Sequence, residues 1–131
     1  MKIKVTNHSL HRFVERILKK EMNHGEFAHK FAADADFRKK VIEEFEKFFF
    51  QNLEDATIYK RSDDSLWIMG GSRIVLAEPL SSERKDFDLL LKTIDFTWLE
   101  LSNGRMGREM KKGPFLRGRL TFLYPTDEKK D

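Results

Sequence analysis

Hydrophobic and polar positions change period within the N-terminal segment. Residues 2–6 alternate polar and apolar side chains, the period of a half-buried β-strand. Thr6 or Asn7 is a favourable N-cap for the helix that follows. The apolar side chains of that helix recur at the spacing of one buried stripe: Leu10, Phe13, Val14, Ile17 and Leu18. Residues 23–25 (NHG) predict its end, with glycine in the left-handed position.

A second helical region covers residues 26–53. A break is expected near residues 33–34, where Asp34 can cap the longer piece. The apolar stripe of this piece is Phe37, Val41, Phe45, Phe48, Phe49 and Leu53. The run of three phenylalanines at residues 48–50 is interpreted as core in preference to a platform for ligand stacking.

From residue 56 onward the pattern is that of strands and turns. Residues 62–65 (SDDS) form a hairpin connection, and turns are expected at Gly70-Gly71 and at Asn103-Gly104. Strands are expected at residues 56–61, 66–69, 72–78, 89–101 and 115–124. The segment 105–114 is expected to be a basic loop, and residues 126–131 a charged flexible tail.

These elements predict a single α+β domain over residues 1–125. An N-terminal strand and two to three helices precede an antiparallel meander of four to six strands. The first strand is expected to join this sheet, with the helices on one of its faces.

Composition agrees with a folded domain of ordinary size. The chain has 131 residues, 40% hydrophobic and 36% charged, and charges of both signs are interspersed through most of it. No apolar run approaches the roughly 18 residues of a membrane span. The N-terminus lacks the apolar region of a signal peptide, and the chain has no cysteine. We therefore expect a cytoplasmic protein without membrane contact.

The net charge is only +3, but its distribution is uneven. Residues 105–119 carry six basic side chains against one acidic one, Glu109. The basic residues are Arg105, Arg108, Lys111, Lys112, Arg117 and Arg119. With Phe115, Phe122 and Tyr124 nearby, this cluster suits single-stranded nucleic acid, whose bases stack on aromatic rings while cations neutralise its phosphates. The alternative is a solvated basic loop with the phenylalanines pointing inward.

The first helix carries a second candidate site. Helical geometry places His8, Arg12, Glu15 and Lys19 on one side, flanked by His11 and Arg16. A histidine that titrates near neutral pH, a carboxylate and phosphate-binding arginines are the groups that a metal-independent ribonuclease needs. The alternative is a solvated helix with a Glu15–Lys19 ion pair. No cofactor is expected: the His8–His11 pair lacks further metal ligands, and the glycines form no nucleotide loop.

Residues 5–16 (VTNHSLHRFVER) resemble the opening of small bacterial and phage ribonuclease-toxin-like proteins. These include the BrnT-like toxins, related RelE-fold domains and the phage endoribonuclease RegB. The order of helices before an antiparallel sheet is also similar, as is the final strand, residues 119–125 (RLTFLYP). The resemblance implies an RNA-cleaving or RNA-binding domain, with His8 as acid or base and Arg12 and Arg16 as phosphate ligands. Arg117 and Arg119 would complete that site.

The sequence thus predicts an RNA-directed protein of phage or mobile-element type, with a metal-independent endoribonuclease as its catalytic form. His8 would act as acid or base and Glu15 as a secondary proton acceptor. The alternative function is a non-catalytic interaction module that binds and modulates a partner protein. Oligomeric state and substrate sequence are not indicated by the sequence.

Overall fold

The computed structural model describes residues 1–77, 86–97, 107–112 and 120–125. In these residues a strand and three helices come first and six further strands follow, so the predicted α+β class is confirmed. The elements are β1 (Lys2–Lys4), α1 (Asn7–Arg16), α2 (His24–Ala33), α3 (Ala35–Leu53), β2 (Thr57–Lys60), β3 (Leu66–Gly70), β4 (Ile74–Ala77), β5 (Leu89–Ile94), β6 (Arg108–Lys112) and β7 (Thr121–Leu123).

The described strands form one seven-stranded sheet in the order β6-β2-β3-β4-β5-β1-β7. Neighbours from β6 to β5 are antiparallel, whereas β1 is parallel to both β5 and β7. The sheet is therefore mixed, and the prediction of a purely antiparallel sheet was wrong for β1. The chain between β1 and β5 contains α1–α3 and β2–β4, which is long enough to allow parallel pairing. An alternating pattern within one strand carries no information about its direction.

The start of α1 was predicted correctly, but its end was not. The backbone N–H of Ser9 donates to the Thr6 hydroxyl at 3.1 Å, and the Thr6 N–H donates to the Ser9 hydroxyl at 3.1 Å, a reciprocal capping box. The helix ends at Arg16, and Lys19 takes the left-handed backbone conformation, with φ of 58°. Asn23 does not stop this helix. Its side-chain oxygen accepts from the Glu26 N–H at 2.8 Å and so caps the start of α2.

The break between α2 and α3 lies at the expected residue. Asp34 is the C-cap of α2 and the N-cap of α3. At the start of α3 its Oδ1 accepts from the Phe37 N–H at 3.0 Å. At 19 residues α3 is the longest described helix. Neither α3 nor any other helix among the described residues is long and apolar enough to cross a membrane.

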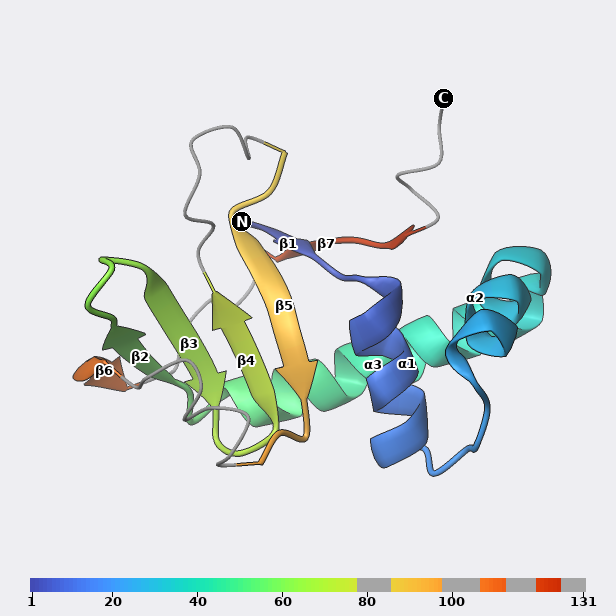
Figure 1. Ribbon diagram of the computed structural model, residues 1–131, viewed down its shortest axis with the longest axis horizontal. Coiled ribbons are helices and arrows are strands. Elements are labelled where there is room, and N and C mark those ends of the chain that lie inside the picture. Colours follow the sequence, from blue (N-terminus) through green and yellow to red (C-terminus); the bar gives the residue numbers. More distant parts are fainter. Residues whose placement is uncertain (78–85, 98–106, 113–119, 126–131) are drawn as a thin grey trace.

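Two helices contact the sheet directly, α1 at β5 and α3 at β3 and β4, while α2 packs on α1 and α3. Figure 1 shows α3 crossing behind the central strands, with α1 and α2 toward the β1–β7 side. Phenylalanines dominate this core, and Phe13 contacts Phe45 edge-on, with ring centroids 5.6 Å apart. In the run at residues 48–50, Phe49 is fully buried, Phe48 is half-buried and Phe50 is 42% exposed. The core interpretation of this run is therefore confirmed for Phe49.

A smaller hydrophobic cluster lies on the opposite face of the sheet. Because side chains alternate along a strand, Ile68 of β3 joins the helix-side core while its neighbour Met69 points away from the helices. Met69, Val75 and Phe96 form this second cluster, and the half-buried rings of Tyr59 and Trp67 pack against it. The two rings occupy directly opposed positions on β2 and β3.

The expected loop at residues 105–114 contains a strand. Residues Arg108–Lys112 pair antiparallel with β2 and form one edge of the described sheet. Its sequence, REMKK, has no alternation of apolar and polar residues, so the pattern did not predict a strand. The strand is defined by its backbone pairing with β2. Gly107 permits the approach, since a Cβ at this position would lie 1.8 Å from the carbonyl oxygen of Lys60.

Candidate nucleic-acid interface

The hairpin between β2 and β3 holds the first group of cations. The Arg61 N–H donates to the Ser65 carbonyl at 3.0 Å, which closes the connection. Inside it the Asp63 carboxylate accepts from the Ser65 hydroxyl at 2.6 Å and from the Ser65 N–H at 3.0 Å. These two hydrogen bonds lower the pKa of Asp63. The Asp63 carboxylate thus fixes the turn that follows Lys60 and Arg61.

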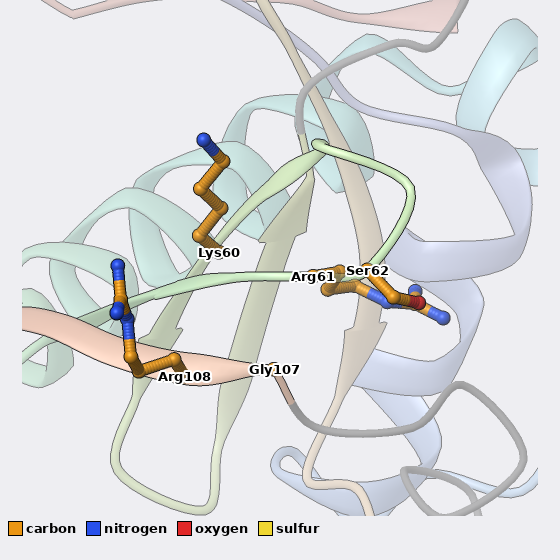
Figure 2. Close-up of a pocket in the computed structure, with 5 residues that line it drawn as sticks. All are labelled: Lys60, Arg61, Ser62, Gly107 and Arg108. Atoms are coloured by element: carbon orange, nitrogen blue, oxygen red, sulfur yellow. The ribbon is translucent and has the colours of Figure 1, made fainter.

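An open hollow lies where the end of β2 meets the start of β6. It has a volume of about 480 Å³ and is lined by Lys60, Arg61, Ser62, Gly107 and Arg108. Figure 2 shows these residues arriving from two chain segments that lie side by side. Three of the five are cationic and none is acidic, so the hollow is suited to an anion.

Lys60 and Arg108 are direct register partners across β2 and β6. In Figure 2 their side chains extend to the same side of the two strands. Like charges at directly opposed positions repel each other and destabilise a strand pair. An anion bound between them would remove that repulsion, and a phosphate group fits both the charge and the hydrogen-bond donors.

Lys60 and Arg61 also contact residues of the hairpin itself. Lys60 Nζ lies 3.4 Å from Asp64 Oδ1, in a pair whose side chains are 46% and 84% exposed. Such exposed pairs contribute little to stability and are weakened by salt. The guanidinium carbon of Arg61 lies 4.2 Å from the ring centroid of Trp67, a cation–π contact. Trp67, Lys60 and Arg61 did not stand out in the sequence, because the cations are separated from the basic segment 105–119.

The predicted basic cluster is only partly described. Arg108 lines the hollow, and the backbones of Lys111 and Lys112 lie in β6 opposite Ile58 and Thr57. Arg105, Arg117, Arg119 and Phe115 lie outside the described residues. The aromatic residues after this cluster face the core: the Phe122 ring lies 4.9 Å from that of Phe49, and Tyr124 is 8% exposed.

The α1 residues of the predicted acid–base site lie near β5, separated from β6 by three strands in the order of the sheet. His8 is exposed, and partial burial together with the nearby charges of Arg12, His24, His11 and Arg16 lowers its pKa. The lowered pKa favours the uncharged form of His8, which can accept a proton.

Glu15 and Arg12 are engaged with each other. Arg12 Nη1 donates to Glu15 Oε1 at 3.0 Å, and Glu15 Oε2 lies 3.7 Å from His11 Nε2. The Glu15 carboxylate thus sits between two of its neighbours on α1, while Arg12 keeps 39% of its side chain exposed.

The side chains of Arg16 and His11 hydrogen-bond to backbone carbonyl groups of other segments. Arg16 Nη1 donates to the carbonyl oxygens of Ile94 at 2.6 Å and Asp95 at 3.1 Å, at the end of β5. His11 is 7% exposed, and its Nε2 lies 2.6 Å from the Met22 carbonyl. Because a carbonyl oxygen can only accept, His11 Nε2 carries the proton. His24 was predicted to lie at the end of the first helix and is instead the first residue of α2. Its ring centroid lies 5.4 Å from that of His11.

The structure does not bring the two predicted groups together among the described residues. α1 packs on β5 and follows β1, whereas Arg108 lies on β6, separated from β5 by β2, β3 and β4. Whether Arg117 or Arg119 approaches His8 falls outside the described residues. Within the described part of the chain, no group of three or more His, Asp or Glu side chains is arranged to hold a metal ion.

Comparison with known proteins identified no relative of this chain. The chain matches no protein-family model, no curated protein and no solved structure among those searched. The resemblance of residues 5–16 to ribonuclease toxins stays a prediction.

Proposed function

We propose that this chain is a cytoplasmic RNA-directed protein that binds the RNA phosphate backbone at the β2–β6 edge of its sheet. The observation that carries the proposal is the opposed pair of Lys60 and Arg108, which line one hollow together with Arg61. Opposed cations destabilise a strand pair, and the exposed Asp64 carboxylate beside Lys60 offsets this only weakly, so a bound phosphate would stabilise the pair. RNA is chosen among polyanions because the N-terminal segment resembles RNA-directed toxins.

Edge strands also carry charged residues simply to prevent pairing with other molecules. That role requires charge but no ligand, so it predicts no RNA binding. The proposal predicts RNA binding that depends on these particular cations.

The test compares two double variants of equal charge. Lys60→Gln with Arg108→Gln removes the opposed pair, and Lys39→Gln with Lys40→Gln removes two exposed cations of α3. Fluorescence anisotropy with a labelled RNA of about ten nucleotides measures the affinity of each. We expect the edge variant to lose at least about tenfold in affinity and the α3 variant to stay close to the parent. Equal losses would indicate nonspecific attraction by net charge, and absence of binding by the parent protein would refute the proposal.

A second candidate function is metal-independent RNA cleavage at His8. It is favoured by the lowered pKa of His8, which leaves this exposed imidazole free to take a proton from a ribose hydroxyl at neutral pH. Arg12 would stabilise the charge on the phosphate. Cleavage of RNA in EDTA that is lost in His8→Ala and kept in His29→Ala would support it. Cleavage that persists in His8→Ala would contradict it.

The interaction module is the competing function. It predicts that the protein binds no RNA even at low salt and that a partner protein binds a surface containing exposed apolar side chains such as Phe50 or Met110. The anisotropy experiment above separates it from the RNA-directed proposal.

A further inference from the structure

We infer that Arg61, stacked on Trp67, is a platform for an unpaired RNA base, so that the ligand of the β2–β6 edge is single-stranded RNA. The inference rests on the proposed function, because it takes RNA binding in the adjacent hollow as given. It adds a recognition element that acts on bases, where Lys60 and Arg108 act on phosphate.

The geometry of Arg61 carries the inference. Its guanidinium carbon lies 4.2 Å from the Trp67 ring centroid, close enough for direct contact with the face of the ring. Arg61 is also one of the residues that line the hollow between β2 and β6, and its side chain extends away from those of Lys60 and Arg108 (Figure 2). A guanidinium is planar and has two faces, and bases stack on guanidinium planes as they do on aromatic rings.

The platform is held in place before any ligand binds. Trp67 is the register partner of Tyr59, and both rings pack against the cluster of Met69, Val75 and Phe96. The hydrogen bond from the Arg61 N–H to Ser65 fixes the backbone at the start of the turn. A side chain ordered in this way loses little conformational entropy on binding.

The arrangement selects against duplexes. Bases inside a helix are stacked on both faces, so they are not available to a protein platform, whereas single strands expose theirs. Ser62, which also lines the hollow, adds a hydroxyl that can hydrogen-bond phosphate or sugar.

The test uses Arg61→Lys, which keeps the charge and removes the plane. Three probes of about ten nucleotides are compared: single-stranded oligoadenylate, an abasic ribose-phosphate chain of equal length, and an RNA duplex. We expect the parent protein to prefer oligoadenylate to both other probes. We also expect Arg61→Lys to weaken the binding of oligoadenylate about tenfold more than it weakens the binding of the abasic chain. Equal affinity of the parent for the three probes, or equal effects of the variant on all three, would overturn the inference.

Tryptophan fluorescence supplies a second readout. In Trp98→Phe the remaining tryptophan is Trp67. Its emission should change on addition of oligoadenylate and stay constant on addition of the abasic chain at equal saturation. Identical responses to both would contradict base stacking while leaving phosphate binding in the hollow intact. If none of the probes binds, the proposed function itself fails and the platform with it.

Discussion

Arg16 in the last turn of α1 donates a 2.6 Å hydrogen bond from Nη1 to the carbonyl oxygen of Ile94, where β5 ends. The same nitrogen donates to the Asp95 carbonyl at 3.1 Å. The Arg16 guanidinium thus donates to two backbone carbonyls and links α1 to the end of β5. The residue that sequence reasoning assigned to phosphate binding has a structural contact as well.

This contact makes Arg16 more important for stability than Arg12. Arg16→Met leaves both carbonyls without this donor, and hydrogen bonds to charged groups contribute about 1.5–3 kcal/mol. Arg12→Met breaks an exposed pair with Glu15, typically worth about 0.2–1 kcal/mol. Urea unfolding followed by circular dichroism should therefore show a clearly larger loss for Arg16→Met. Equal losses would mean that the Arg16 contacts contribute nothing specific.

Gly107 should be intolerant of any side chain. The Cβ of Gly107→Ala would meet the Lys60 carbonyl oxygen at 1.8 Å, so β6 has to move away from β2. We expect a loss of about 1–3 kcal/mol and weaker RNA binding, since the hollow is built from both strands. Gly25→Ala is the control, because its Cβ would lie 3.4 Å from the nearest atom and alanine favours the helix. A Gly107→Ala protein as stable as the parent would contradict the described pairing of β6.

Adjacent phenylalanines of α3 should differ sharply. Phe49 is fully buried and packs edge-on against Phe122 at 4.9 Å, so Phe49→Ala should cost about 3–5 kcal/mol. Phe50 is 42% exposed, and its replacement by alanine should cost far less. The difference is measurable from the midpoints of urea unfolding. Similar costs at both positions would show that the register of α3 on the sheet is incorrect.

His8 should make stability depend on pH. Its pKa is lower in the folded protein than the ordinary value near 6.5 because of partial burial and the neighbouring cations. The unfolded chain therefore binds the proton more readily, so acidification from about pH 7 to below 6.5 favours unfolding. His8→Gln should lose less stability than the parent between these pH values. A parent-like pH dependence in His8→Gln would contradict the shifted pKa.

Most of the fold was predictable because it follows local rules. The capping residues Thr6 and Asp34 and the stripe through Phe45 and Phe49 are recorded in the spacing of neighbouring residues. The direction of β1 was not predictable, because it depends on which strands lie beside it. Asn23 was misread because a glycine two residues later suits a helix end, while here Asn23 caps the start of the next helix.

The candidate site was predictable only in part. Arg108 stood out within a basic segment, but its partner Lys60 lies in a different strand and gains meaning only through the register of β2 and β6. Trp67 was treated as an ordinary strand residue, and its contact with Arg61 depends on the geometry of the hairpin. Sequence spacing thus identified one half of the hollow, and strand pairing supplied the other.

The salt dependence of RNA binding tests the central claim most directly. The logarithm of the association constant should fall linearly with the logarithm of salt concentration, by about 0.7 for each phosphate neutralised on a single strand. If Lys60 and Arg108 each contact phosphate, changing both to Gln should reduce the slope by about 1.4, and changing Lys39 and Lys40 should leave it unaltered. A slope that is the same in the parent and in the Lys60/Arg108 variant would contradict phosphate binding at this edge of the sheet.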